Sequence, residues 1–310
     1  MPGREESPIA WLGEAPDPAL LGGKGASLDR LLRMGFRVPP GFCLTTAAFR
    51  DQCAALDAGT LDAGALDPGA HAPSHAAADG SPAWLAALAT GPLVSSVAVP
   101  LRASLDRLVG ELRNAAITDP RFAVRSSAIG EDGSVASYAG LHETELNLAA
   151  ADVPGAVSRC WASLWSPAAV AYRARRGLAA DDVAMAVVVQ ALVPADAAAV
   201  VFTRHPVTGR EDQLVITAVR GLGDAMVAGT VTPDTYVVDK VSQATLEAEP
   251  GEDPSGPALD GAGLAGIVGL ALEVEAGFGA PVDIEAALAG GSWYLLQARP
   301  ITALSSAPTT

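Results

Sequence analysis

The stretch PVDIEAALAGGSWYLLQARPIT, residues 281–302, indicates the fold most clearly. Alternate side chains of a strand share one face, so Asp283 and Glu285 point the same way, and so do Gln297 and Arg299. The spacing of about ten residues between these two pairs suits a β-hairpin, and the apolar residues beside them predict that its other face is buried. The sequence therefore predicts a hairpin that carries two carboxylates, an amide and a guanidinium.

Carboxylate and amide oxygens are hard ligands that suit Mg²⁺, which usually keeps several waters and binds nucleotide phosphates. Glu285 and Gln297 are the candidate ligands, and Arg299 could face a phosphoryl group during its transfer. An amphipathic edge hairpin with a solvated polar face would show the same pattern. The residues of the hairpin alone leave both interpretations open.

A second candidate site is the stretch LGGKGASL, residues 21–28. Three glycines surround Lys24 at the predicted start of a helix, where backbone N–H groups and an ammonium suit a polyphosphate. The glycine spacing differs from that of a P-loop. A helix-capping loop with a solvated lysine is the alternative interpretation.

A third candidate is FAVRSSAIGEDGSVASYAG, residues 122–140. Arg125 lies near the end of a predicted strand and offers a planar fork for phosphate oxygens. The loop that follows is rich in glycine and serine, includes Ser137 and Gly140, and could close over phosphates as a lid. An ordinary surface loop, with Arg125 in an ion pair, is equally compatible with the pattern.

The rest of the chain predicts a mixed helix-and-strand protein. Helical spacing of leucines appears in residues 100–114, and a helix pair or one bent helix is expected over residues 157–178. Further strands are predicted, besides the hairpin, within residues 121–128, 142–148, 181–193, 198–203, 212–219 and 235–240. Residues 57–82 are rich in Ala, Gly, Asp and Pro, which predicts a mobile surface insertion.

Composition excludes some classes of partner. The chain has 310 residues and a formal net charge of −15, which argues against nucleic acid or an anionic membrane as the main partner. The most apolar run, residues 183–202, is interrupted by polar residues and does not resemble a membrane span. No signal peptide is visible and the three cysteines lack metal-ligand spacing, so we expect reduced thiols in a soluble cytoplasmic protein.

Seven motifs occur in a familiar order between about residue 20 and residue 303, with residues 51–118 outside the match. They are LGGKGASLDRL with GFRVPPGFCLTT, AVRSSAIGEDGSVASYAGLHETELNL, CWASLWSPAAVAYR, VVVQALV, VVFTRHPVTG, GLGDAMVAGTVTPDTYVVDK, and DIEAAL with WYLLQARPIT. Together they resemble the ATP-binding domain of phosphoenolpyruvate synthase, pyruvate phosphate dikinase and rifampin phosphotransferase. The resemblance implies an α/β (α+β) ATP-grasp fold whose two lobes enclose ATP, with residues 1–189 in one lobe, 190–304 in the other and 305–310 as a loose tail.

The resemblance also implies a kinase-type transferase. In that family ATP gives its β-phosphoryl group to a histidine on a mobile domain, and AMP and inorganic phosphate are formed. Position by position, it implies phosphate binding by Lys24 and Arg125, an adenine-side hinge with Gln190, Leu192 and Val193, Mg²⁺ binding by Glu285 and Gln297, orientation or charge stabilisation by Asp283 and Arg299, and a lid from Ser137 to Gly140.

The sequence departs from the family pattern in two ways. Ala286, Ala199 and Leu141 replace a tryptophan, a glycine and a glutamine that the family usually has. No histidine lies in the glycine-rich context of a phosphohistidine domain, and no acceptor-binding domain is recognisable. We therefore expect an ATP-dependent phosphotransferase that passes the phosphoryl group to a separate partner protein. The alternatives are a stand-alone small-molecule kinase or pyrophosphokinase, a fragment or degenerate relative, and a non-catalytic ATP-binding module.

Overall fold

The computed structural model describes residues 7–15, 17–58, 85–128, 144–176 and 184–301. These residues form two compact units. The first contains the described residues up to Asp29 and those from Pro40 to Leu192, and the second contains Arg30–Pro39 and the described residues from Val193 onward. The lobe boundaries predicted from the sequence stay a prediction. Nearly all of the predicted insertion, the predicted lid and the tail lie outside the described residues.

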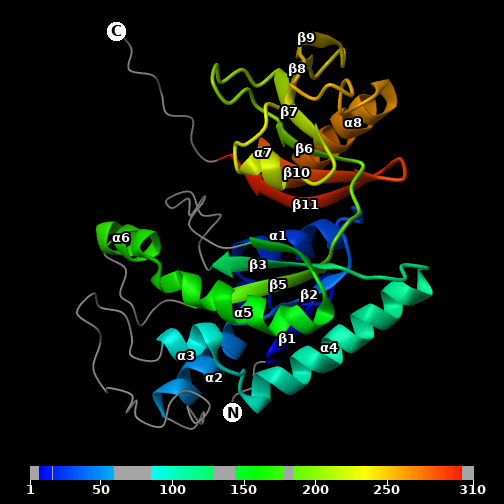
Figure 1. Ribbon diagram of the computed structural model, residues 1–310. Coiled ribbons are helices and arrows are strands. Elements are labelled where there is room, and N and C mark those ends of the chain that lie inside the picture. The colour runs from blue at the N-terminus through cyan, green and yellow to red at the C-terminus, as the bar shows by residue number, and fades with distance from the viewer. Residues whose placement is uncertain (1–6, 16, 59–84, 129–143, 177–183, 302–310) are drawn as a thin grey trace. The chain divides into compact units, whose positions relative to one another are not determined.

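The first unit is built on a five-stranded sheet in the order β1-β2-β5-β3-β4, in which every neighbouring pair is antiparallel (Figure 1). The strands predicted near residues 121–128, 142–148 and 181–193 are therefore confirmed. The sequence did not predict β1, because three residues carry too little pattern. The strands of this sheet are β1 (Ile9–Trp11), β2 (Gly41–Leu44), β3 (Phe122–Ala128), β4 (Thr144–Leu148) and β5 (Met185–Ala191).

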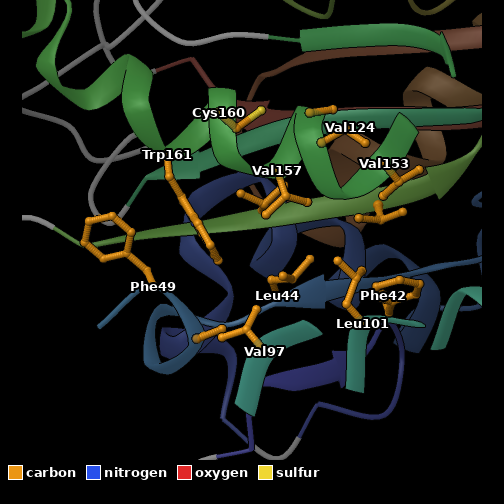
Figure 2. Packing of buried hydrophobic residues seen from close by; sticks show 14 of the residues in the cluster. Phe42, Leu44, Phe49, Val97, Leu101, Val124, Val153, Val157, Cys160 and Trp161 are labelled. Atoms are coloured by element: carbon orange, nitrogen blue, oxygen red, sulfur yellow. The ribbon is translucent and has the colours of Figure 1, made fainter. Parts of the chain in front are cut away.

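Helices of the first unit bury one face of this sheet in an apolar core (Figure 2). The leucine spacing that predicted a helix is confirmed, because Leu101, Leu105, Leu108 and Leu112 of α4 are all buried. Trp161 is fully buried and meets Phe49 edge-on, with ring centroids 5.9 Å apart. The helices are α1 (Gly22–Arg33), which continues into the second unit, α2 (Thr46–Asp57), α3 (Leu85–Thr90), α4 (Ser95–Asn114), α5 (Val153–Ala162) and α6 (Pro167–Arg176).

The start of α1 packs on the other face of the same sheet. Gly22 has φ +65°, and a Cβ there would lie 2.0 Å from the carbonyl oxygen of Ser127. The hydroxyl of Ser127 accepts a hydrogen bond from the backbone N–H of Gly25 at 3.0 Å and donates one to the carbonyl oxygen of Leu21 at 2.7 Å. The glycines around Lys24 therefore allow a close contact between helix and strand inside the protein.

Replacing Gly22 with alanine is expected to lower the free energy of unfolding by about 3 kcal/mol, since the change adds both backbone strain and a steric clash. Chemical denaturation measures this loss. Gly35 is the matched control, because it also has a positive φ, +86°, but no atom within 4 Å of its would-be Cβ. A loss for Gly22→Ala no larger than that for Gly35→Ala would contradict the close contact with Ser127.

The second unit contains a six-stranded antiparallel sheet in the order β11-β10-β6-β7-β8-β9 (Figure 1). The predicted strands of this region are confirmed, and β9, an exposed edge strand, is additional. The mixed α+β class expected from the sequence is thus observed in both units. The strands are β6 (Ala197–Phe202), β7 (Gln213–Arg220), β8 (Asp234–Asp239), β9 (Thr245–Glu249), β10 (Val282–Ala289) and β11 (Ser292–Pro300), and the helices are α7 (Asp224–Val227) and α8 (Gly261–Phe278).

Helix α8 was not predicted, although both of its ends carry ordinary signals. The carboxylate of Asp260 accepts a hydrogen bond from the N–H of Gly263 at 2.7 Å, and Gly279 ends the helix in a left-handed conformation. The helix covers β10 and β11, where the indole N–H of Trp293 donates to the carbonyl of Gly263 at 3.1 Å. This packing defines one face of the β10–β11 hairpin as the helix-covered face.

The apolar run at residues 183–202 forms parts of two strands, β5 and β6, and is not a helix. Two other helical stretches, Leu85–Asn114 and Gly261–Phe278, are long and apolar enough to cross a membrane by length and composition. That criterion is weak evidence, because core helices of globular proteins meet it as well. The second stretch is α8, which packs against its own sheet.

Candidate functional site

The polar residues near the chain's end lie on the β10–β11 hairpin, as predicted. Asp283 pairs directly with Arg299, and Glu285 pairs directly with Gln297. Gly290 and Gly291, with φ of +53° and +72°, form the two-residue connection between the strands. Two glycines with positive φ suit a tight hairpin turn whose twist matches that of the strands. Local sequence thus fixes the register that brings the four polar side chains together.

A β-bulge controls which face these side chains occupy. Glu285 pairs with Gln297, yet the next residue, Ala286, pairs with Leu295, so Leu296 is the extra residue. Directly opposite residues share a face, so Leu295 lies on the helix-covered face with Trp293. Gln297, only two residues further along, lies on the other face with Glu285. The bulge therefore separates the polar half of β11 from its apolar half, which simple alternation along the strand would not do.

Asp283 and Arg299 form a close ion pair on that polar face. One carboxylate oxygen of Asp283, Oδ2, accepts a hydrogen bond from Nε of Arg299 at 2.8 Å and also lies 2.8 Å from Nη2 of the same guanidinium. The Asp283 side chain is only 12% exposed and that of Arg299 is 34% exposed. Burial raises the pKa of Asp283, the guanidinium of Arg299 opposes that rise, and the neighbouring Glu285 adds to it. The pair fixes the direction of the guanidinium, because two of its nitrogens are held by one oxygen.

Glu285 and Gln297 offer two hard oxygen donors side by side. Directly opposite residues of an antiparallel pair have Cβ atoms about 5 Å apart, and Gln297 is 7% exposed. Within the described residues, no group of three or more His, Cys, Asp or Glu side chains could hold a metal ion. A Mg²⁺ ion at Glu285 and Gln297 would complete its shell with phosphate oxygens and water, as this ion usually does. The donor set therefore fits the ion.

The first unit holds the predicted phosphate-side residues. Lys24 is half-buried in the first turn of α1, next to Gly25, whose N–H is held by Ser127. Arg125 lies two residues before Ser127 on β3, so both side chains point to the sheet face that the start of α1 covers. Gln190 of β5 is 2% exposed and pairs with Ala123 of β3, which places it on the same face as Arg125. The unit thus gathers Lys24, Arg125 and Gln190 on one face of its sheet.

The remaining predicted residues divide into two groups. Leu192 is half-buried at the end of the first unit, where its N–H donates to the carbonyl of Arg121 at 2.8 Å, and Val193 begins the second unit and is buried. Ser137 and Gly140, the predicted lid residues, lie outside the described residues. None of these positions gives geometry that tests an adenine or lid role, and these roles stay predictions.

The structure also shows residues that sequence reasoning missed. Ser127 anchors the start of α1, and Thr203, Lys240 and Glu275 form a largely buried polar group next to the start of β10. The sequence could have indicated Ser127, because it lies two residues after Arg125 on a predicted strand and therefore shares its face. The other three come from the residue after β6, the β8–β9 turn and α8, and no local pattern relates them.

Lys24 at a glycine-rich helix start and the Glu285–Gln297 pair on a hairpin are residue types that would suit a nucleotide-binding α+β domain. Residues 18–255 match the family model described as the pyruvate phosphate dikinase AMP/ATP-binding domain, and the chain belongs to this family. The resemblance drawn from the seven motifs is therefore confirmed.

Curated relatives extend the match over nearly the whole chain. It is 33% identical to a probable phosphoenolpyruvate synthase of Archaeoglobus fulgidus over 96% of this chain and 42% of the relative. It is 36% identical to rifampicin phosphotransferase of Streptomyces sviceus, over 94% of this chain and 35% of the relative. A third relative is the prodigiosin synthesizing transferase PigC of Serratia marcescens, 35% identical over 92% of this chain and 32% of the relative. The chain thus spans less than half the length of these curated relatives.

Proposed function

We propose that this chain is the ATP- and Mg²⁺-dependent part of a phosphotransferase that phosphorylates a histidine on a separate partner protein. The observation that carries the proposal is the β10–β11 hairpin, which presents Asp283, Glu285, Gln297 and Arg299 on one face in a chain of an ATP-binding family. Relatives named phosphoenolpyruvate synthase and rifampicin phosphotransferase support an ATP-dependent transfer. Each of these relatives also extends well beyond the region that this chain matches.

The proposed reaction is the dikinase type. A nitrogen of the partner's histidine bonds to the β-phosphorus of ATP, and the bond from that phosphorus to the bridging α,β-oxygen breaks, so that AMP leaves. Water then takes the γ-phosphoryl group as inorganic phosphate, and phosphohistidine remains. Charge develops on the phosphoryl oxygens during the first step, and donors already held in place stabilise it best.

Each side chain has a proposed task. Lys24 and Arg125 bind phosphate oxygens, and Gln190, Leu192 and Val193 line the adenine side. Glu285 and Gln297 hold Mg²⁺, which neutralises phosphate charge when it is bound. Arg299 stabilises the transferring group, and Asp283 keeps the guanidinium oriented, because its Oδ2 lies 2.8 Å from both Nε and Nη2. We also expect a cytoplasmic location, which the free state of all three cysteines supports.

The test is incubation with ATP labelled at the β-phosphate, alone and with proteins encoded beside this chain. The expected result is AMP formation and an acid-labile, base-stable label on a partner protein, which is the behaviour of phosphohistidine. The Glu285→Ala variant is the negative control, because it lacks a proposed metal ligand. Formation of ADP with a small-molecule acceptor would support a stand-alone kinase instead. ATP binding without turnover in any combination would support a non-catalytic module, and both outcomes would overturn the proposal.

A further inference from the structure

We infer that Lys240, Glu275 and Thr203 act as positioning residues for the start of β10 and hence for Glu285 and the metal site. This inference rests on the proposed function, because it gives these three residues a role in the same site. Thr203 directly follows β6, Lys240 directly follows β8 and Glu275 lies on α8. All three are in the second unit, and none is one of the four polar residues of the hairpin. Together these three side chains form the K–E–T network.

Thr203 forms hydrogen bonds with both the backbone N–H and the backbone carbonyl of Val282. The ladder between β6 and β10 begins at the pair Phe202 and Asp283. One residue beyond it, the N–H of Thr203 donates to the carbonyl of Val282 at 2.9 Å, and the N–H of Val282 donates to the hydroxyl of Thr203 at 2.8 Å. Both residues are fully buried. The side chain of Thr203 thus extends the backbone pairing to the residue directly before Asp283.

The hydroxyl of Thr203 is in turn oriented by a charged group. It donates to Oε1 of Glu275 at 3.1 Å, and the ammonium of Lys240 donates to Oε1 and Oε2 of Glu275 at 2.6 and 2.7 Å. The Lys240 and Glu275 side chains are 14% and 19% exposed. A hydroxyl that donates to a carboxylate is a stronger acceptor, because hydrogen bonds in a chain polarise one another. The network therefore strengthens the bond that holds Val282.

The position of Glu275 shows why Lys240 is needed. Glu275 lies in the last turn of α8, four residues before the helix-ending Gly279. A carboxylate is disfavoured at a helix C-terminus, where the helix dipole is negative, and burial adds to that cost. Lys240 follows β8 and supplies the compensating charge from another element. Removing it would leave a poorly solvated carboxylate beside Thr203.

The link to the metal site is the register of β10. Val282 directly precedes Asp283. Glu285 lies two residues after Asp283, on the same face of the strand, and pairs with Gln297. A change in the register or order of this strand start would move both carboxylates, because the side-chain period of a strand is two residues. Residues that orient metal ligands without binding the metal themselves typically lower the metal affinity about 10- to 100-fold when they are removed. The K–E–T network is placed to have this effect.

The test uses four variants of the full chain. Lys240→Met removes the ammonium and Lys240→Arg restores a positive charge; Thr203→Val removes the hydroxyl with little change of shape, and Thr203→Ser restores it. One readout is amide hydrogen exchange at Val282, Asp283 and Ile284, and the other is Mn²⁺ affinity in the presence of a non-hydrolysable ATP analogue. Arg210→Met is the control, since it breaks an exposed ion pair of the same unit, with Arg210 Nη2 2.7 Å from Asp212.

Lys240→Met and Thr203→Val are expected to weaken Mn²⁺ binding about 10-fold or more and to speed exchange selectively at Val282 to Ile284. Lys240→Arg and Thr203→Ser should recover most of the Mn²⁺ affinity and most of the protection from exchange. Arg210→Met should change neither the Mn²⁺ affinity nor the exchange rates. Unchanged Mn²⁺ affinity in Lys240→Met and Thr203→Val would overturn the inference. Loss of protection spread evenly over the unit would overturn it too, because it would indicate a purely structural role. Absence of nucleotide-dependent Mn²⁺ binding in the wild-type chain would overturn the proposed function itself, and selective exchange at Val282 would still support the network's hold on β10.

Discussion

Replacing Arg299 with alanine is expected to lower the rate of phosphoryl transfer on the order of 10³-fold, while ATP binding changes much less. Removing one preorganised donor to developing charge costs about 3–4 kcal/mol in the barrier, and each 1.4 kcal/mol is about a tenfold change in rate. The guanidinium is preorganised because Asp283 holds two of its nitrogens at 2.8 Å. The measurement is the single-turnover rate of AMP formation with a partner that the wild-type chain phosphorylates.

Two further variants identify the cause of that loss. Arg299→Lys keeps the charge but loses the planar fork, so its rate should fall between those of the wild type and Arg299→Ala. Arg210→Ala removes a similar two-point contact with an aspartate, Asp212, in the same unit, and should leave the rate unchanged. A rate within threefold of wild type for Arg299→Ala would remove this residue from the proposed chemistry.

The hairpin could be predicted from the sequence because everything that specifies it is local. Alternation of polar and apolar residues and the pair Gly290–Gly291 lie within one short stretch. The bulge at Leu296 could not be predicted in this way. Leu295, Leu296 and Ala298 are apolar or small and could occupy either face of the strand. The packing of Trp293 on α8 decides which face each residue occupies.

Long-range contacts explain the other omissions. The hydroxyl of Thr203 meets a carboxylate 72 positions away, and Ser127 meets Gly25 across 102 positions. No periodicity in a window of ordinary length reports such pairs. The sequence alone favours room for a polyphosphate at the glycines around Lys24, whereas two of them, Gly22 and Gly25, are needed for contacts with Ser127 and Cys43 inside the protein. Glycine content alone could not distinguish these two uses, and phosphate binding by Lys24 remains a prediction.

Replacing Glu285 or Gln297 with alanine is expected to remove metal-dependent turnover, with a loss on the order of 10³-fold or more at ordinary Mg²⁺ concentrations. Each change deletes one of the two oxygen donors that the hairpin places directly opposite one another. Excess Mg²⁺ or Mn²⁺ should restore part of the rate for Gln297→Ala, because the charged ligand Glu285 remains. It should restore little for Glu285→Ala. Titration of the initial rate against each metal ion measures both effects.

The fold should survive both changes, because alanine substitutions of this kind on a strand usually cost about 1–2 kcal/mol. Gln213→Ala and Glu247→Ala are matched controls, since Gln213 is a buried glutamine on β7 and Glu247 an exposed glutamate on β9 of the same sheet. The two control variants should lower the thermal midpoint by about as much as the hairpin variants do, and they should leave the metal dependence of turnover unchanged. Equal losses of turnover in the controls and in the hairpin variants would mean that stability, and not metal binding, limits the rate. Unchanged metal dependence in Glu285→Ala would exclude this carboxylate as a ligand.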